Sequence, residues 1–106
     1  MNTVLALKSR PDALFCFNDT VAVGAMDRAF EAGLRIPRDI AFVGSGNFHY
    51  SSKLRVPLSS IDQKAGEIGE RAAKMITSLL GKAPSNRARA TVLEPTLIVR
   101  ASSKLK

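Results

Sequence analysis

Short apolar runs alternate with longer amphipathic stretches along the first half of the chain. Residues 13–17 (ALFCF) are apolar at every position, and residues 40–43 (IAFV) form a second such run. Runs that are apolar on both sides of the strand period are typical of strands covered on both faces, as in a parallel sheet. With a helix between them, they predict a right-handed strand–helix–strand unit whose second strand ends in a turn at 44–46.

The helix of this unit is predicted over residues 20–32. Asn18 and Asp19 precede it and carry oxygens that can cap its free N–H groups, and Gly33 suits a left-handed residue at its end. The helix is apolar on most of its circumference and carries one narrow charged stripe. Such a helix packs on a sheet with one side, while its other side is either further core or a subunit interface.

The second half of the chain predicts another helix over residues 63–80, begun by Asp62 and ended by Gly81. Its apolar positions recur at helical spacing, and two i,i+4 charge pairs lie on its outer face, so we expect a one-faced helix lying on a domain. The remaining predictions are a helical turn at 3–8, an extended piece at 58–61, a polar connector at 82–88, an extended segment at 90–99 interrupted by Pro95, and a frayed tail at 100–106.

Composition indicates a globular chain of one domain or part of one. The 106 residues are 45% hydrophobic and 24% charged, which excludes wholesale disorder. The single cysteine, Cys16, cannot form an internal disulfide and suits a reducing compartment. We find neither a signal-peptide pattern nor a stretch long enough to span a bilayer, so we expect a cytoplasmic protein. The uncapped helix at 3–8 suggests that the chain opens inside an element of a longer protein.

The net charge of +7 admits two interpretations. It indicates either an anionic partner, such as nucleic acid or an acidic membrane, or a solvated basic surface. The basic residues group only loosely, at 82–89 and 100–106, and no aromatic residues interleave with them. Because no nucleic-acid-binding motif is visible either, the solvated surface is favoured.

Two polar turns follow the predicted strands, at Asn18 and Asp19 and again at residues 45–47. In open α/β sheets small molecules bind beyond the carboxyl ends of the strands, so we predict a ligand site that includes both turns. The loop after the second turn carries the only histidine and the only tyrosine, His49 and Tyr50. These residues either contact a ligand or partner or are simply solvated.

The sequence shows no combination of residues that is typical of a catalytic site. Cys16 and His49 could form a nucleophile and a base, but a thiol among apolar strand residues is usually inert. One histidine and one cysteine do not make a metal site, and the glycines at 44 and 46 lack the lysine of a phosphate loop. We therefore predict a non-catalytic binding protein without a metal or cofactor.

Several segments together resemble the C-terminal subdomain of LacI/GalR-type transcriptional regulators. Residues 11–47 contain an Asn-Asp pair after the first strand, followed by a Gly-Leu-x-Ile-Pro-x-Asp-Ile pattern and a Val-Gly strand end. Residues 56–80 (VPLSSIDQ and the helix after it) are similar to the family's Pro-Leu-Thr-Thr-Val-x-Gln segment, and residues 92–103 (VLEPTLIVRASS) to its closing strand.

The resemblance implies an α/β fold with a partial parallel sheet flanked by helices, from a domain of periplasmic-binding-protein type I fold. Residues 1–61 and 89–101 would belong to the C-terminal subdomain, and residues 62–81 would form a helix that packs on the other subdomain. Family members carry a DNA-binding helix-turn-helix headpiece that this chain does not contain. The resemblance therefore implies a partial domain that exposes apolar helix surface unless it self-associates.

Effector and dimer contacts follow from the same resemblance. Asn18 matches a position that commonly hydrogen-bonds a sugar, and Asp19 its helix-start partner, whereas Ser45 and Gly46 replace the usual aromatic residue and Asp. Asn47 and Tyr50 would compensate for that loss, so the predicted effector-binding residues are Asn18, Asp19, Asn47 and Tyr50. The predicted dimer contacts are Val23, Met26, Asp27, Phe30, Ser52, Leu54 and Val56.

The leading interpretation is thus the effector-sensing and dimerising part of a LacI-type regulator, with a sugar or related metabolite as effector, and DNA bound only through the headpiece. The alternative is a fragment of a periplasmic sugar-binding protein of the same fold, which a signal peptide in the upstream gene sequence would indicate. A third class, a small hydrolase using Cys16, would show a thiol that reacts near neutral pH.

Overall fold

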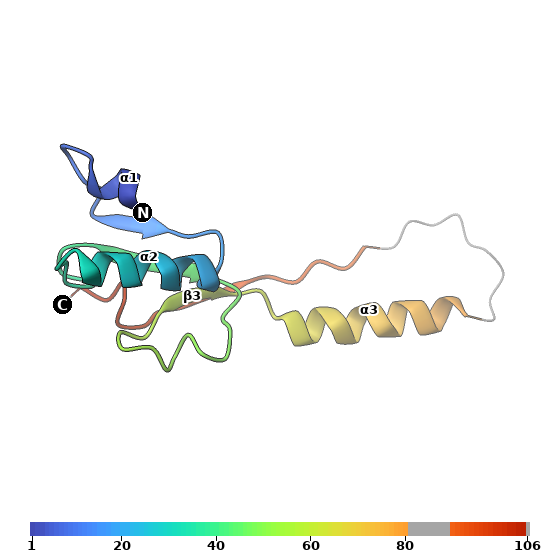
Figure 1. Cartoon of the computed structure of the whole chain (residues 1–106). Coiled ribbons are helices and arrows are strands. Elements are labelled where there is room, and N and C mark those ends of the chain that lie inside the picture. The colour runs from blue at the N-terminus through green and yellow to red at the C-terminus, as the bar shows by residue number, and fades with distance from the viewer. Residues whose placement is uncertain (81–89, 106) are drawn as a thin grey trace.

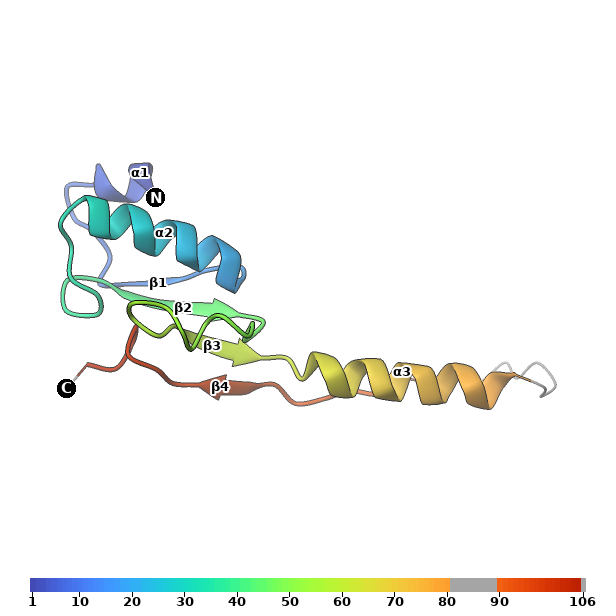
Figure 2. The ribbon, with the colours of Figure 1, turned by 60° about the horizontal axis from the view of Figure 1, so that its bottom comes forward.

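The computed structural model describes residues 1–80 and 90–105. Within these residues the strand order of the sheet is β1-β2-β3-β4, with β1, β2 and β3 parallel and β4 antiparallel at the edge. The predicted α/β fold with a partial parallel sheet is confirmed, and the antiparallel fourth strand makes the sheet mixed (Figures 1 and 2). The elements are α1 (Asn2–Leu5), β1 (Ala13–Phe15), α2 (Asp19–Glu31), β2 (Ala41–Ser45), β3 (Ser59–Asp62), α3 (Ala65–Leu79) and β4 (Thr96–Ile98).

Helix α2 forms where the sequence predicts it and covers one face of the sheet (Figure 2). The Asn18 side chain accepts a hydrogen bond from the Val21 N–H at 2.8 Å, which caps the helix start. Gly33 ends it with a φ of +79°, in the left-handed region that glycine tolerates. The buried apolar residues between α2 and the sheet are Cys16, Ala22, Met26, Ala29, Ile36, Ile40, Phe42 and Leu58.

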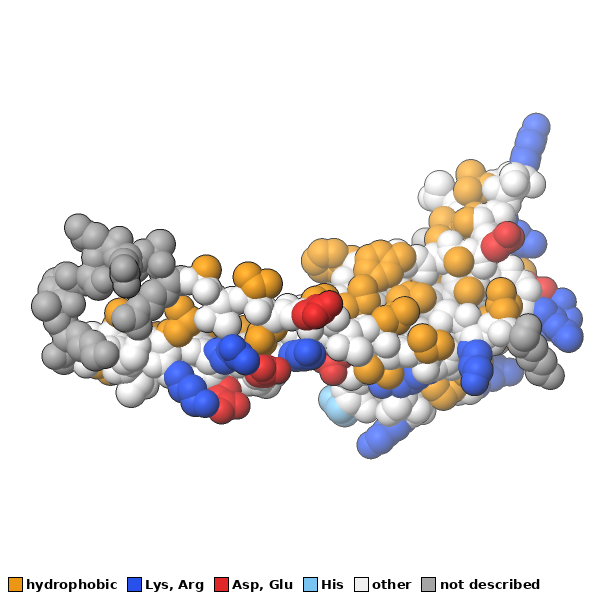
Figure 3. Space-filling model, turned by 180° about the vertical axis from the view of Figure 1, so that it is seen from behind, with side chains coloured by type: hydrophobic (Ala, Val, Ile, Leu, Met, Phe, Trp, Pro, Cys, Tyr) orange, Lys and Arg blue, Asp and Glu red, His pale blue; other side chains and the backbone are white. Residues whose placement is uncertain are grey.

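The opposite face of the sheet is open within the described part of the chain. Phe15 on β1, Leu97 on β4 and the following Val99 are 66%, 54% and 58% exposed, and apolar side chains gather on this side of the body (Figure 3). The prediction that strand 13–17 is covered on both faces is therefore wrong for this structure. The strand also ends early, at Phe15, although the Cys16 N–H still donates to the Val43 carbonyl at 2.8 Å.

Helix α3 extends away from the sheet instead of lying on it (Figure 1). The Cα radius of gyration is 18.9 Å, whereas a compact chain of this length has about 13 Å. The helix buries none of its residues, and a groove of 370 Å³ lies between its apolar side and the returning segment at 91–93. The predicted charge pairs are present on its other side, Glu67 with Arg71 at 3.0 Å and Glu70 with Lys74 at 2.8 Å.

Two details at the ends of α3 differ from the prediction or lie beyond it. The residue that begins the helix is Lys64, in a left-handed conformation with φ +56°, and not Asp62. Asp62 instead accepts the Lys64 N–H at 2.8 Å, forming the turn just before the helix. The predicted helix end at Gly81 and the connector at 82–88 lie outside the described residues.

The segment after β4 is part of the fold, so the prediction of a frayed tail at 100–106 is wrong for its first residues. Ser102 is fully buried, its N–H donates to the Pro57 carbonyl at 2.9 Å, and its hydroxyl donates to the Phe42 carbonyl at 2.6 Å. The same hydroxyl accepts the Ser59 N–H at 2.8 Å. These bonds attach the segment after β4 to Phe42 on β2 and to Ser59 on β3.

The helical turn predicted at 3–8 is shorter and earlier, at Asn2–Leu5. No helix among residues 1–80 and 90–105 combines the length and the apolar character needed to cross a bilayer.

Candidate functional site

The two predicted turns lie at the same edge of the sheet, because β1 and β2 run parallel. β3 is also parallel to β2, so its carboxyl end, with Asp62 and Gln63, reaches that edge as well. The sequence pattern predicts a site at the turns after β1 and β2, and the structure adds the end of β3 to it. The extended piece predicted at 58–61 is the signal for this third position, because a parallel strand there would bring its carboxyl end to the same edge of the sheet.

Asp19, the first residue of α2, connects three parts of this edge. Its side chain is completely buried, and its carboxylate accepts hydrogen bonds from the Ser60 hydroxyl at 2.5 Å, the Ser51 hydroxyl at 2.5 Å and the Phe48 N–H at 2.9 Å. These donors offset the cost of burying the carboxylate. Because the carboxylate has no exposed surface and already accepts three hydrogen bonds, the structure gives Asp19 a role within the fold, and the predicted effector contact through it stays a prediction. Asp19 holds the loop after β2, and β3, against the start of α2.

Asn18 is half-buried and uses only one of its polar atoms within the fold. Its Oδ1 caps α2 through Val21, and its Nδ2 has no hydrogen-bond partner among the described residues. The backbone donor at Val21 determines which way the amide faces, since only the oxygen can accept from it. Asn18 therefore offers two N–H donors at the end of β1, which suits a ligand with acceptor oxygens.

Asn47 has both of its side-chain groups engaged. Its Oδ1 accepts from the Arg100 guanidinium at 2.6 Å, and its Nδ2 donates to the Asp62 carboxylate at 3.4 Å. Its backbone N–H donates to the Ser60 hydroxyl at 3.0 Å, and its φ is +48°. Asn47 is thus held firmly in the turn. One N–H of its amide remains for a bound molecule.

Arg100 is part of a loose basic group in the sequence, at 100–106, and its role in the fold does not follow from that pattern. Its guanidinium donates to the Leu58 carbonyl at 2.7 Å as well as to Asn47, and its backbone N–H donates to the Ser59 hydroxyl at 2.7 Å. The Arg100 guanidinium therefore forms hydrogen bonds within the site and is not part of a solvated basic surface.

The rest of the turn after β2 is bonded to the end of β3. The Gly46 N–H donates to the Ile61 carbonyl at 2.8 Å, and Gln63 Nε2 donates to the Ser45 hydroxyl at 2.7 Å. Ser45, which stands where the resemblance implies an aromatic residue, is buried and binds Gln63.

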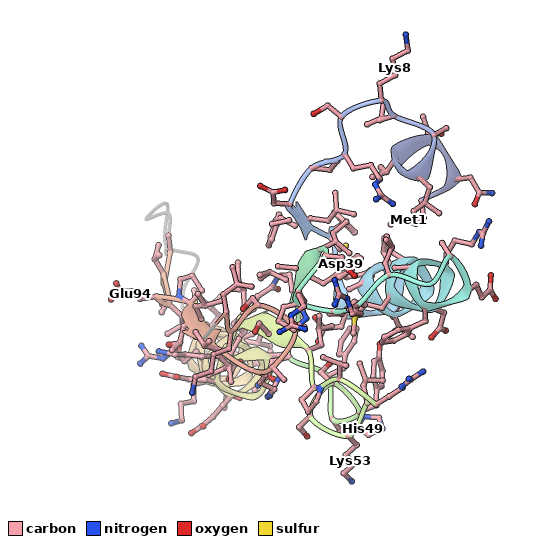
Figure 4. The ribbon with its side chains drawn as sticks, turned by 90° about the vertical axis from the view of Figure 1, so that its left-hand side faces the viewer. Met1, Lys8, Asp39, His49, Lys53 and Glu94 are labelled. Atoms are coloured by element: carbon pink, nitrogen blue, oxygen red, sulfur yellow. The ribbon has the colours of Figure 1, made fainter. Side chains whose placement is uncertain are left out.

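The aromatic residues of the following loop pack on one another. Tyr50 lies 5.7 Å from Phe48 and 5.5 Å from His49 between ring centroids, and its hydroxyl is 2.9 Å from the Thr20 hydroxyl at the start of α2. Tyr50 therefore connects the loop to α2. His49 is exposed and projects from the loop together with Lys53 (Figure 4), which agrees with the solvated alternative for His49.

The predicted dimer residues lie on one surface, with one exception. A shallow groove of 50 Å³ between α2 and the loop is lined by Arg55 and by Val23, Met26, Asp27, Phe30, Leu54 and Val56. The Arg55 guanidinium lies 4.8 Å from the centroid of the Phe30 ring. Ser52 is exposed and is not among the residues that line the groove.

Cys16 and His49 do not form a catalytic pair in this arrangement. Cys16 is 8% exposed beneath α2, where burial raises the pKa of its thiol, while His49 points to solvent from the loop (Figure 4). Among the described residues no group of three or more His, Cys, Asp and Glu side chains is placed to hold a metal ion.

The edge of the sheet thus presents amide groups, held by buried hydrogen bonds, that are suited to binding a polar small molecule. An arrangement of this kind, at the carboxyl ends of parallel strands, is typical of ligand-binding α/β domains. The sequence matches the family described as "Periplasmic binding protein-like domain" over residues 1–103. The chain belongs to this family.

Curated relatives narrow the class to transcriptional regulators. The chain is 36% identical over 104 residues to the HTH-type transcriptional repressor PurR of Mannheimia succiniciproducens, and 38% identical over 102 residues to the ribose operon repressor of Haemophilus influenzae. These matches cover 98% and 96% of this chain but only 31% and 30% of the relatives. The chain therefore spans less than a third of their length.

Solved structures agree with the sequence relatives. A LacI-type transcription regulator from Bifidobacterium animalis subsp. lactis matches with a TM-score of 0.87 and 30% identity, over 98% of this chain and 37% of that one. A LacI family regulator from Lactobacillus casei with bound sucrose matches with a TM-score of 0.76 and 29% identity, over 89% of this chain and 34% of that one. The chain is part of a LacI/GalR-type effector-binding domain, and the predicted family is confirmed.

Proposed function

We propose that this chain senses a small-molecule effector and forms a dimer as part of a LacI-type transcriptional regulator. DNA binding in that regulator is by a helix-turn-helix domain, and the effector controls it. The observation that supports this proposal is the pair of amide side chains, Asn18 and Asn47, presented at the ends of neighbouring parallel strands and connected through Asp19 and Ser60.

The proposed effector is a sugar or a related polar metabolite. A regulator with the same fold holds sucrose, and a relative is named as the ribose operon repressor. Sugar hydroxyls accept hydrogen bonds, and the Asn18 Nδ2 group has two N–H donors without a partner among the described residues. Asn18 and Asn47 are the proposed contacts, while Asp19 and Tyr50 position the site.

The proposed dimer contact is the groove between α2 and the loop at 50–56. Its apolar side chains, with Phe30 under the Arg55 guanidinium, form the proposed dimer contact, and exposed Ser52 would lie at its rim. The proposed location of the protein is the cytoplasm, where a DNA-binding regulator acts, and no catalytic role is assigned to it.

The alternative of a periplasmic sugar-binding protein shares the fold and the edge of the sheet. The curated relatives favour the regulator, because those described above are repressors. A helix-turn-helix sequence upstream in the gene would agree with the proposal, and a signal peptide there would contradict it.

The effector contact is tested by Asn18→Ser. Serine keeps an oxygen that caps α2, so the thermal stability of the chain should stay the same, while the two N–H donors are lost. On titration of the native chain with ribose or sucrose we expect nuclear magnetic resonance shifts of the Asn18 and Asn47 side-chain amides. In Asn18→Ser the Asn47 amide is the signal that remains, and its shifts should be weaker. Equal binding by the variant would reject Asn18 as a contact, and the absence of any shift with either sugar would contradict the proposed effector class.

A further inference from the structure

Both segments that connect the sheet to α3 pass the turn at 45–47. The outgoing segment contains Asp62, at the end of β3, and the returning segment continues through β4 to Arg100 (Figure 2). Asn47 bonds to both of them, through Arg100 Nη2 at 2.6 Å and Asp62 Oδ2 at 3.4 Å. It is the one residue of the turn whose side chain joins the two segments.

These two partners require a side chain between them that can both accept and donate a hydrogen bond. A guanidinium only donates hydrogen bonds and a carboxylate only accepts them, so the side chain between Arg100 and Asp62 must accept on one side and donate on the other. The amide of Asn47 does both, with its oxygen toward Arg100 and its nitrogen toward Asp62. An aspartate at this position would place two carboxylates against each other.

Asp62 is also hydrogen-bonded to the residue that begins α3. Its second oxygen, Oδ1, accepts the backbone N–H of Lys64 at 2.8 Å, and Lys64 has the left-handed φ of +56° at which the chain changes direction into the helix. The carbonyl of Lys64 then accepts the first helical bond, from the Ile68 N–H at 2.9 Å. The direction in which α3 leaves the sheet therefore depends on the carboxylate that Asn47 holds.

A second, independent bond runs beside this one. Gln63 Nε2 donates to the buried Ser45 hydroxyl at 2.7 Å, so two successive residues before α3 are bonded to the same turn. The turn at 45–47 is thus bonded to both residues that precede the start of α3, Asp62 and Gln63.

We propose that Asn47, bonded to both Arg100 and Asp62, is the positioning residue that couples the effector-facing turn to the orientation of α3. This inference rests on the proposed effector site, because it assigns a signalling role to the turn at that site. A molecule that engages the free N–H of Asn47 shifts the amide relative to Asp62 and so changes the turn at Lys64.

Hydrogen exchange on the full chain, without any ligand, tests the coupling. Asn47→Gly removes the side chain while glycine accepts the φ of +48° without strain. Loss of the two side-chain bonds should speed exchange of the Lys64 and Arg100 amides about tenfold. His49→Ala in the same loop is the control, because His49 is exposed, and it should leave both amides unchanged. Faster exchange confined to residues 46–48 would overturn the proposal.

A pair of charge-exchanging variants decides whether Asp62 is the partner. Asn47→Asp sets a carboxylate against Asp62 and should also speed exchange at Lys64. Adding Asp62→Asn supplies an N–H donor to the new carboxylate, while its Oδ1 still accepts from Lys64, so exchange should return toward the original rate. A double variant no better than Asn47→Asp alone would overturn the coupling. Because no effector is present, this outcome is independent of whether sugars bind.

Discussion

The Ser60 hydroxyl on β3 donates a hydrogen bond of 2.5 Å to the Asp19 carboxylate at the start of α2. Both side chains are fully buried, and 41 positions separate them in the sequence. The same hydroxyl accepts the Asn47 N–H at 3.0 Å. The two ligand-facing turns are therefore joined through one buried serine, and the geometry of the site depends on the fold as a whole.

Replacing Asp19 should destabilise the chain strongly. Asp19→Ala leaves the Ser51 and Ser60 hydroxyls and the Phe48 N–H without their buried acceptor, and we expect a loss of about 3 kcal/mol in the free energy of unfolding. Urea denaturation measures it. Glu31→Ala, at an exposed position of the same helix outside the proposed dimer groove, removes one surface ion pair with Arg28 and should change stability by less than about 0.5 kcal/mol. Equal effects at both positions would contradict the role assigned to Asp19.

Gly44 should not tolerate a side chain, because β2 passes very close to Asp19. A Cβ at this position would collide with Asp19 Oδ1 and lie 3.1 Å from Leu58 Cδ2. Gly44→Ala should lower the free energy of unfolding by about 1–3 kcal/mol through overpacking. Gly24→Ala is the matched control, since a Cβ there meets no atom within 4 Å, and it should raise stability by about 0.5–1 kcal/mol as a helix substitution. Thermal melts of both variants measure the difference.

Self-association should depend on the groove between α2 and the loop. Val23 lines this groove, and Val23→Glu places a charge on the proposed dimer contact, so sedimentation velocity should show a monomer. Val92→Glu is the matched control on a different surface, since Val92 is 89% exposed beside α3. A dimer that survives Val23→Glu and is lost with Val92→Glu would assign the contact to the groove of α3. A native chain that sediments as a monomer would contradict the dimer altogether.

The Arg35–Asp39 pair should make stability depend on pH in the acid range. Three hydrogen bonds from Arg35, at 2.7 to 2.8 Å, hold the pKa of the Asp39 carboxyl well below its usual range. A carboxyl whose pKa is lowered by folding stabilises the chain above the unfolded pKa, near about 4, and loses that contribution as the pH falls further. Asp39→Asn should therefore be less stable than the native chain at neutral pH, with the gap closing in acid. A gap that persists unchanged in strong acid would reject this cause.

The Cys16 thiol should react slowly in the native state. Burial under α2 leaves it 8% exposed and raises the pKa of the thiol, so the reactive thiolate is scarce near neutral pH. Labelling with a disulfide reagent should accelerate by at least about tenfold when the chain is unfolded in guanidinium. Fast labelling of the folded chain would contradict this prediction and would support Cys16 as a nucleophile.

Local pattern was sufficient for the elements that depend on nearby residues. Helix α2 forms between its predicted cap at Asn18 and its predicted stop at Gly33, because capping and left-handed turns are decided within a few residues. The identity of the family also followed from motifs in order and spacing. By contrast, residues 13–17 were expected to be buried on both faces, yet Phe15 is open to solvent, because periodicity does not show which neighbours are present.

The sequence by itself determined the strand–helix–strand unit, the family and the position of the two polar turns. Only the tertiary structure decided which side chains of those turns are free to bind and which are already engaged. Asp19 is buried under three donors, Asn47 is held between Arg100 and Asp62, and Asn18 keeps its N–H groups free among the described residues. The reason is physical: a hydrogen bond between residues 41 or 53 positions apart depends on strand register and burial, and no local pattern encodes either.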